Sequence, residues 1–201
     1  MLCTLDDLKQ RLGIETKSEH DALLTRLIAG FTRRADSYTH RGLIVTAAAV
    51  TEYYAGGTAY LQLRRYPIVA ITSIKECLGY NFTEAEPLTA GEEYRIVQPG
   101  EGDRGVLERL WCPWRGGLGD VQVVYRGGFC AAGATPAAGE FALPDDLREA
   151  AIQQCSLLFK RRDDIGLSGV SFDGGGFNKF ESLKLLPEVM AVLDSYKRIE
   201  I

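Results

Sequence analysis

Apolar side chains recur at helical spacing in the first forty residues. Leu5, Leu8 and Leu12 lie three or four positions apart, Thr4 precedes them as a helix cap, and Gly13 is placed to end the helix. The pattern predicts a short helix, followed by a long amphipathic one that ends before the glycine at position 42. The apolar stripe of that second helix is formed by Leu24, Leu27, Ile28, Phe31, Ala35 and Tyr38.

Between residues 45 and 126 the pattern changes to short stretches rich in Val, Ile, Thr and Tyr, separated by Gly, Pro and Asn. This pattern predicts a small antiparallel sheet or barrel rather than alternating strands and helices. Gly56-Gly57 predicts a turn that joins the first two strands as a hairpin. The predicted strands are 50–54, 60–63, 68–74, 94–97, 106–110 and 121–126.

Helical spacing returns after Leu143-Pro144, and Pro187 opens a last amphipathic helix. The sequence therefore predicts an α+β fold, with a mainly helical frame of about four helices and a small antiparallel β region inserted between helices two and three. We assign residues 1–44 and 140–201 to the helical frame, 45–128 to the β region, 129–139 to a linker and 166–182 to a mobile Gly-rich loop.

Composition narrows the functional classes. The chain has 201 residues, a net charge of −4 and 46% hydrophobic residues, which is typical of a globular protein. Its apolar runs are too short for a membrane span, and the acidic first fifteen residues do not resemble a signal peptide. The acidic balance argues against tight binding of nucleic acid over the whole surface.

No pattern in the chain indicates catalysis, a cofactor or a metal. The phosphate-binding Gly-Lys pair is absent, and Ser168 lies in a sequence that lacks the second glycine of a nucleophile elbow. His20 and His40 have no metal-ligand spacing. An odd number of cysteines without a C-x-x-C pair favours reduced thiols in a cytoplasm; these are Cys3, Cys77, Cys112, Cys130 and Cys155.

Several features suit interfaces, although each has a structural explanation as well. Trp111 and Trp114 bracket a proline and form either a buried corner or an interface anchor. Phe172, Phe177 and Phe180 are apolar residues in the Gly-rich loop, so we take them as contacts made on assembly. The short basic clusters at 33–34, 64–65 and 160–162 are typical of solvated helix ends and strand edges, or of a local DNA contact.

The order of motifs along nearly the whole chain resembles the tailed-phage head–tail connector, or adaptor, proteins of the virion neck. The motifs are Leu5-x-x-Leu8-Lys9, Leu12-Gly13-Ile14, Asp21-x-Leu23-Leu24, Tyr38-Thr39-x-Arg41, Leu61-x-Leu63, Tyr66-Pro67-Ile68, Ile71-Thr72-Ser73-Ile74, Trp111-Cys112-Pro113, Val121-x-Val123-x-Tyr125-x-x-Gly128 and Leu143-Pro144-x-Asp146-Leu147. A basic stretch at 160–162 and Tyr196-Lys197-Arg198 close the set.

The resemblance implies a structural protein without enzymatic activity or cofactor. It implies that twelve copies form a ring beneath the portal protein. DNA would pass through the channel of this ring without sequence-specific binding. The distal parts of the ring would contact the next neck or tail protein. The protein would be made in the host cytoplasm, have no membrane association and reside in the virion neck. The C-terminal residues expected to dock on the portal are Tyr196, Lys197, Arg198, Ile199 and Ile201.

Three other functions remain open from the sequence. A stopper or tail-completion protein of the virion has a similar plan, but such proteins lack the flanking helices. A DNA-binding accessory protein would use the arginine pairs. A small hydrolase or transferase would use Ser168 or a cysteine as its nucleophile.

Overall fold

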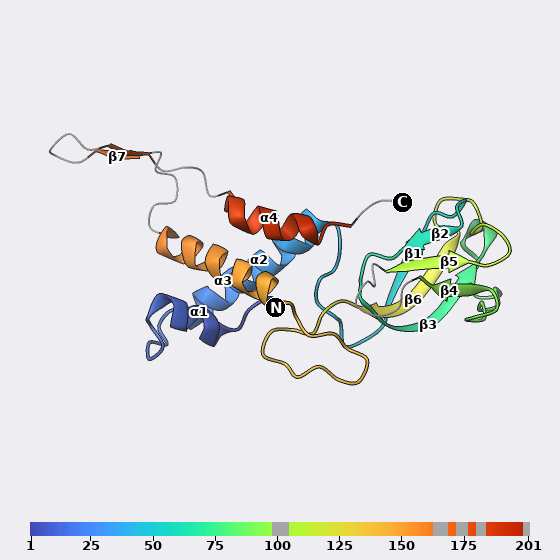
Figure 1. The fold of residues 1–201 in the computed structure, drawn as a ribbon, viewed down its shortest axis with the longest axis horizontal. Helices are drawn as coiled ribbons and strands as arrows, with labels where there is room; N and C mark the ends of the chain where they lie inside the picture. Colours follow the sequence, from blue (N-terminus) through green and yellow to red (C-terminus); the bar gives the residue numbers. More distant parts are fainter. Residues whose placement is uncertain (98–104, 163–168, 172–176, 180–183, 199–201) are drawn as a thin grey trace. The chain divides into compact units, whose positions relative to one another are not determined.

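A computed structural model describes residues 1–97, 105–162, 169–171, 177–179 and 184–198 (Figure 1). The described residues combine helices with small antiparallel sheets, and strands β1–β6 lie between the second and third helices as the sequence predicts, so the α+β fold is confirmed. The chain divides into a helical unit, Met1–Ala35 with Pro144–Tyr196, and a β unit, Asp36–Leu143 with Lys197–Ile201. Among the described residues, no helix combines the length and the apolar character that crossing a membrane requires.

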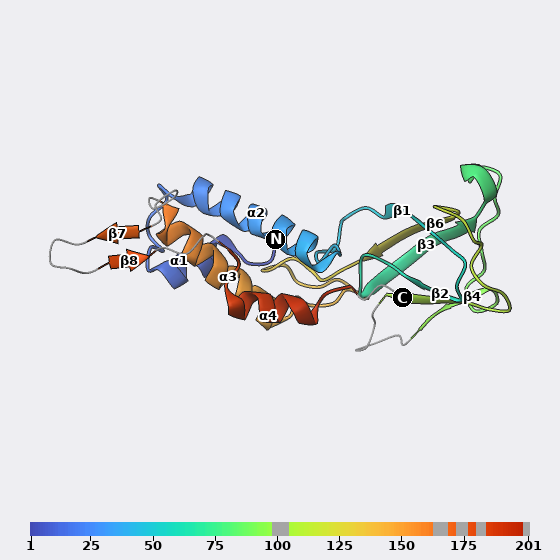
Figure 2. The same ribbon diagram turned by 90° about the horizontal axis from the view of Figure 1, so that it is seen from above.

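The helical unit is built from α1 (Leu5–Leu12), most of α2 (Asp21–Thr39), α3 (Asp145–Lys160) and α4 (Pro187–Ser195). α3 lies between α1 and α4 in both views (Figures 1 and 2). The predicted start of α1 is confirmed in detail, because Thr4 and the third residue of the helix form a reciprocal capping box. Gly13 ends the helix in the left-handed conformation, with a φ of 67°.

The core of the helical unit is the stripe that the sequence predicts on α2, together with the inner face of α3. Phe31 is 3% exposed and is enclosed by the unit. The buried residues of these two faces are Leu24, Ile28, Phe31, Ala35, Leu147, Ala151 and Cys155. One buried polar side chain links α3 to the start of α4: the Gln154 amide accepts from the Leu186 N–H at 2.9 Å and donates to the Lys184 carbonyl at 3.3 Å. The first turn of α4 is therefore tied to the middle of α3.

The β unit holds two three-stranded antiparallel sheets. One has the order β1-β6-β3 and the other β2-β5-β4. The strands are β1 (Val50–Tyr54), β2 (Tyr60–Gln62), β3 (Ile68–Glu76), β4 (Tyr94–Ile96), β5 (Val106–Arg109) and β6 (Val121–Gly127), with the 3-10 turn η1 (Leu78–Tyr80) after β3. Each strand lies where the alternation of the sequence predicts it.

The predicted hairpin between the first two strands is wrong. β1 pairs with β6, and β2 pairs with β5, so the two strands belong to different sheets. The Gly56-Gly57 segment crosses between the sheets, and its amides bind the carbonyls of Gly117 and Trp114 instead of closing a turn. Gly56 is required there because a Cβ would lie 2.6 Å from the Arg115 carbonyl carbon.

Alternation along β6 explains the core of the β unit. Val121, Val123 and Tyr125 are fully buried, while the residues between them are half-buried. These side chains meet the inner faces of both sheets, and Trp114 joins them at 1% exposure. The core therefore lies between the two sheets.

A third, two-stranded antiparallel sheet lies within the segment predicted to be a mobile loop. Its strands are β7 (Gly169–Ser171) and β8 (Phe177–Lys179) (Figure 2). The sequence does not predict this hairpin, because its strands are three residues long and are flanked by glycines that favour a loop. Phe177 lies in β8, whereas Phe172 and Phe180 lie outside the described residues.

Candidate interaction surfaces

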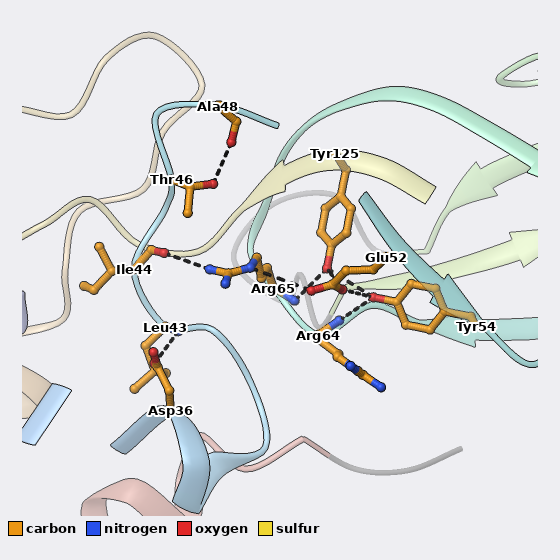
Figure 3. Close-up of polar contacts among 10 residues, drawn as sticks. All are labelled: Asp36, Leu43, Ile44, Thr46, Ala48, Glu52, Tyr54, Arg64, Arg65 and Tyr125. Carbon is orange, nitrogen blue, oxygen red and sulfur yellow. Dashed lines mark hydrogen bonds and ion pairs between the residues drawn. The ribbon is translucent and has the colours of Figure 1, made fainter. Parts of the chain in front are cut away.

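A half-buried carboxylate organises one end of the β unit (Figure 3). Glu52 on β1 accepts hydrogen bonds from the hydroxyls of Tyr54 and Tyr125, the second at 2.7 Å. Burial raises the pKa of both tyrosine hydroxyls well above their usual range, so both remain protonated donors. The network thus joins β1 to β6 through three side chains.

The same two hydroxyls fix the main chain that precedes β3. The Arg64 N–H donates to the Tyr54 hydroxyl and the Arg65 N–H to the Tyr125 hydroxyl, both at 3.0 Å. Consecutive backbone amides are therefore held by a network anchored on Glu52, which sets where the two arginine side chains begin (Figure 3).

These arginines line a pocket of about 440 Å³ that lies within the β unit. The lining carries four guanidinium groups against two carboxylates, so the pocket is net positive. Its residues are Asp36, Ser37, His40, Arg41, Gly42, Glu52, Arg64, Arg65 and Arg198. The pair at 64–65 is visible in the sequence as a basic cluster. Nothing in the sequence predicts that Arg41 and Arg198 lie beside it in the fold.

The four guanidinium groups are held to different degrees. Arg41 is 5% exposed, stacks on the Tyr66 ring and donates to the Tyr66 carbonyl. Arg65 donates to the Ile44 carbonyl at 3.3 Å, and its Nε lies 3.8 Å from a Glu52 oxygen. The exposed Arg64 side chain reaches only the Tyr54 ring, 6.0 Å away, among the contacts of the described residues. Arg64 is therefore the cation most available to a ligand.

Small residues and backbone contacts shape the pocket wall. A Cβ on Gly42 would lie 2.6 Å from the Arg65 guanidinium carbon, so glycine at this position leaves room for that side chain. Asp36 receives the Leu43 N–H at 2.9 Å, which closes the turn after α2. Burial raises the pKa of the Asp36 carboxyl, partly offset by the Leu43 hydrogen bond.

The two tryptophans have opposite environments. Trp114 is 1% exposed and belongs to the core, so this residue is not available as a surface anchor. Trp111 is 93% exposed, has a φ of 68° and donates through Nε1 to the Glu92 carbonyl at 2.9 Å. Of the predicted pair, only Trp111 offers its ring to a partner.

The described C-terminal residues contact their own chain. In the helical unit, the Tyr196 hydroxyl donates to the Asp146 carboxylate at 2.8 Å. In the β unit, the Lys197 carbonyl accepts from the Tyr66 hydroxyl at 3.4 Å, and Arg198 donates to the Gln62 carbonyl at 2.8 Å. Ile199 and Ile201, the apolar members of the predicted portal-docking set, lie outside the described residues.

No cluster of three or more His, Cys, Asp or Glu residues with metal-binding geometry occurs in the part of the chain that the structure describes. The candidate interaction surfaces are the arginine pocket and the exposed Trp111.

Comparison with protein families identifies residues 3–90 with the family described as phage gp6-like head-tail connector proteins. This segment runs from the start of α1 through α2 and β3 to the loop before β4. The resemblance to the head–tail connector family is confirmed. Among curated proteins, no sequence matches this chain.

Solved structures extend the likeness of the fold beyond residue 90. A chain from the neck of an empty GTA particle, computed with C6 symmetry, shares 17% identity at a TM-score of 0.62, covering 100% of this chain and 91% of that one. A chain from the neck of a native GTA particle, computed with C12 symmetry, shares 18% identity at a TM-score of 0.56, covering 90% and 85%. A chain from the virion of a native gene transfer agent particle shares 20% identity at a TM-score of 0.60, covering 98% and 88%.

Proposed function

We propose that this connector is the subunit of a ring in the neck of a tailed phage or phage-like particle. The ring lies beneath the portal protein and joins the DNA-filled head to the next neck or tail protein. The family match over residues 3–90 carries the proposal, and it is supported by a fold shared along the whole chain with neck proteins of particles reconstructed with six- and twelve-fold symmetry. A closed ring of about twelve copies is what a heterologous interface gives when its rotation closes.

DNA passes through the channel of this ring without sequence-specific binding. The net charge of −4 supports this assignment, because a strongly basic lining would hold the phosphate backbone instead of letting it slide. The role of the chain is architectural: it positions other proteins and performs no reaction. It is made in the host cytoplasm and ends in the virion.

Two surfaces serve the neighbours in the neck. Trp111 is the anchor for the next neck or tail protein, because its indole is 93% exposed and tryptophan is enriched at interface hot spots. The portal is met by the C-terminal set from Tyr196 to Ile201, of which Ile199 and Ile201 supply the apolar contacts. The segment with Phe172, Phe177 and Phe180 contributes to assembly.

The test is attachment to heads. Purified connector is added to portal-bearing heads from particles that lack it, and the necks are imaged by electron microscopy with averaging. We expect a ring of density beneath the portal, and none on heads without a portal. Absence of neck density on portal-bearing heads would overturn the proposal.

The same experiment separates a connector from a stopper. A stopper attaches only to heads that already carry a connector ring, whereas this chain is expected to attach directly to the portal. Attachment that requires a pre-existing connector would therefore assign the chain to the later position in the neck.

A further inference from the structure

We propose that the arginine pocket of one copy receives the carboxylates of Glu84 and Glu86 from a second copy of the same chain. The proposal rests on the ring described above and names the contact that joins its subunits. It is carried by two observations within the β unit: a net positive pocket with an available cation, and an acidic loop at the opposite end of one strand.

The pocket selects an anion. Four guanidinium groups face two carboxylates, and one of these, Glu52, already accepts two tyrosine hydroxyls. Arg64 is exposed, and the described residues offer its guanidinium no hydrogen bond or ion pair. A carboxylate that enters the pocket would gain charge-assisted hydrogen bonds from a planar, forked donor.

The acidic loop after β3 supplies matching groups. Glu84 and Glu86 are exposed, and the described structure shows neither in a salt bridge; Glu84 only accepts from the Asn81 side chain at 3.2 Å. Four other acids of the β unit are already paired with arginines: Glu76 and Glu93 with Arg109, Glu108 with Arg95, and Glu140 with Arg126. The loop therefore carries two carboxylates that have no cationic partner among the described residues.

The loop is held in place at the far end of β3. The Lys75 ammonium donates to the Phe82 carbonyl at 3.0 Å, and the Leu88 N–H donates to the Ile74 carbonyl at 2.8 Å. Figure 2 shows η1, which opens this loop, beyond the last residues of β3. The two glutamates are thus presented on an anchored loop, which lowers the entropy lost on binding.

The geometry requires two copies. Arg64 and Arg65 precede β3, and the acidic loop follows it, so the nine-residue strand separates them by roughly 25 Å at ~3.3 Å per residue. Glu84 and Glu86 cannot reach the pocket of their own chain. Complementary sites at opposite ends of one unit form a heterologous contact, which repeats from copy to copy and closes into a ring.

DNA phosphate is the competing ligand, and the structure favours the carboxylates. Arg41 and Arg65 are held in the wall of this open pocket by contacts with the Tyr66 and Ile44 carbonyls, so Arg64 is the cation that an incoming anion meets first. The net charge of −4 disfavours a polyanionic duplex on the surface as a whole.

The experiment measures self-association of the full chain by sedimentation velocity at low and high ionic strength. Arg64→Glu and the double variant Glu84→Arg/Glu86→Arg are each expected to raise the dissociation constant at least tenfold. The triple variant that carries all three changes is expected to recover wild-type association, because the charges are again complementary. Salt should weaken association of the wild type, since exposed ion pairs are screened.

Matched controls distinguish the contact from a general charge effect. Arg34→Glu and Glu15→Arg/Glu188→Arg change the same charges at exposed positions in the helical unit and should leave association unchanged. Circular dichroism checks that each variant folds. Arg64→Ala, which removes the cation without adding a like charge, should weaken association to a smaller extent.

Three results would overturn the inference. The first is a wild type that remains monomeric at low ionic strength up to its solubility limit. The second is a triple variant that does not recover wild-type self-association. The third is an Arg64→Glu variant that binds duplex DNA less well but self-associates as the wild type does, which would assign the pocket to phosphate. Each of these leaves the head-attachment test intact, so failure of this contact and failure of the connector role are observed separately.

Discussion

Asp7 joins the start of α1 to α3, and replacing it with Asn tests how the helical unit is held together. Its carboxylate accepts the Thr4 N–H at 3.0 Å as part of the capping box. It also accepts the Arg148 Nε–H at 2.9 Å and a second hydrogen bond from the same guanidinium. Asp7→Asn keeps the size of the side chain and removes the charge.

The magnitude follows from the pKa of the carboxyl. The hydrogen bond from Arg148 is the main cause that lowers the pKa of Asp7 from 3.8 to about 2, against the opposing effect of burial. A shift of one pKa unit corresponds to ~1.4 kcal/mol. The Asp7 side chain is 14% exposed but that of Arg148 is 41% exposed, so solvent screening weakens the pair. We expect Asp7→Asn to reduce the free energy of unfolding by about 1–2 kcal/mol at pH 7.

The sign of the pH dependence is fixed by the same shift. The pKa of Asp7 is lower in the folded state than in the unfolded state, where it is ~3.9. The stabilisation is therefore fully present above about pH 5 and is lost as the pH falls towards 2. The free-energy gap between wild type and Asp7→Asn should close over this range.

The assay is urea unfolding at pH 7 and at a pH near 2, followed by the helical circular dichroism signal. Asp6→Asn is the matched control, because Asp6 lies in the same helical turn and is exposed. A gap of the same size at both pH values, or an equal loss in the Asp6 variant, would refute the assignment of the stabilisation to the Asp7–Arg148 pair.

Three further predictions concern the core and the surfaces. Phe31→Ala should cost roughly 3–5 kcal/mol in urea unfolding, since the ring is 3% exposed; a loss below ~1 kcal/mol would contradict its place in the core. Trp114→Ala should destabilise the β unit by a similar ~3–5 kcal/mol, whereas Trp111→Ala should leave the melting temperature nearly unchanged and reduce joining of tails to heads; equal melting temperatures for the two variants would refute this division. Deleting residues 199–201 should weaken attachment to portal-bearing heads in a pull-down, and undiminished attachment would remove these residues from the docking set.

Local signals predicted the helices well because each one is decided by residues near it in sequence. The capping box at Thr4, the left-handed Gly13 and the proline at the first position of α4 are all contacts or conformations within a few residues. The α2 stripe is periodic over several turns, so its buried face could be identified without knowing what covers it.

Strand pairing was harder to predict because it depends on residues far apart in the chain. The strand limits follow from alternation, but Val50 pairs with Tyr125 and Tyr60 with Glu108. Gly56-Gly57 is a common turn signal, and only the position of the 114–117 loop shows that these glycines serve a close backbone approach. The β7–β8 hairpin was missed because its glycine-rich sequence is also typical of a loop.

The arginine pocket shows why a functional surface can be invisible in a sequence that reveals its fold. Arg64 and Arg65 form an unremarkable basic pair by themselves, and the sequence offers solvation as a sufficient explanation. Folding places them beside Arg41 from the end of α2 and Arg198 from the end of the chain, so that cations from three distant segments line one recess. Their positions depend on Glu52. The sequence alone suggests a polar residue on the outer face of a strand, but in the fold its carboxylate accepts hydrogen bonds from two tyrosine hydroxyls. A half-buried carboxylate orders an arginine pair at one end of β3, and carboxylates without a cationic partner among the described residues lie at the other end. Under the proposed contact, each copy therefore has two unlike ends, as a head-to-tail ring requires.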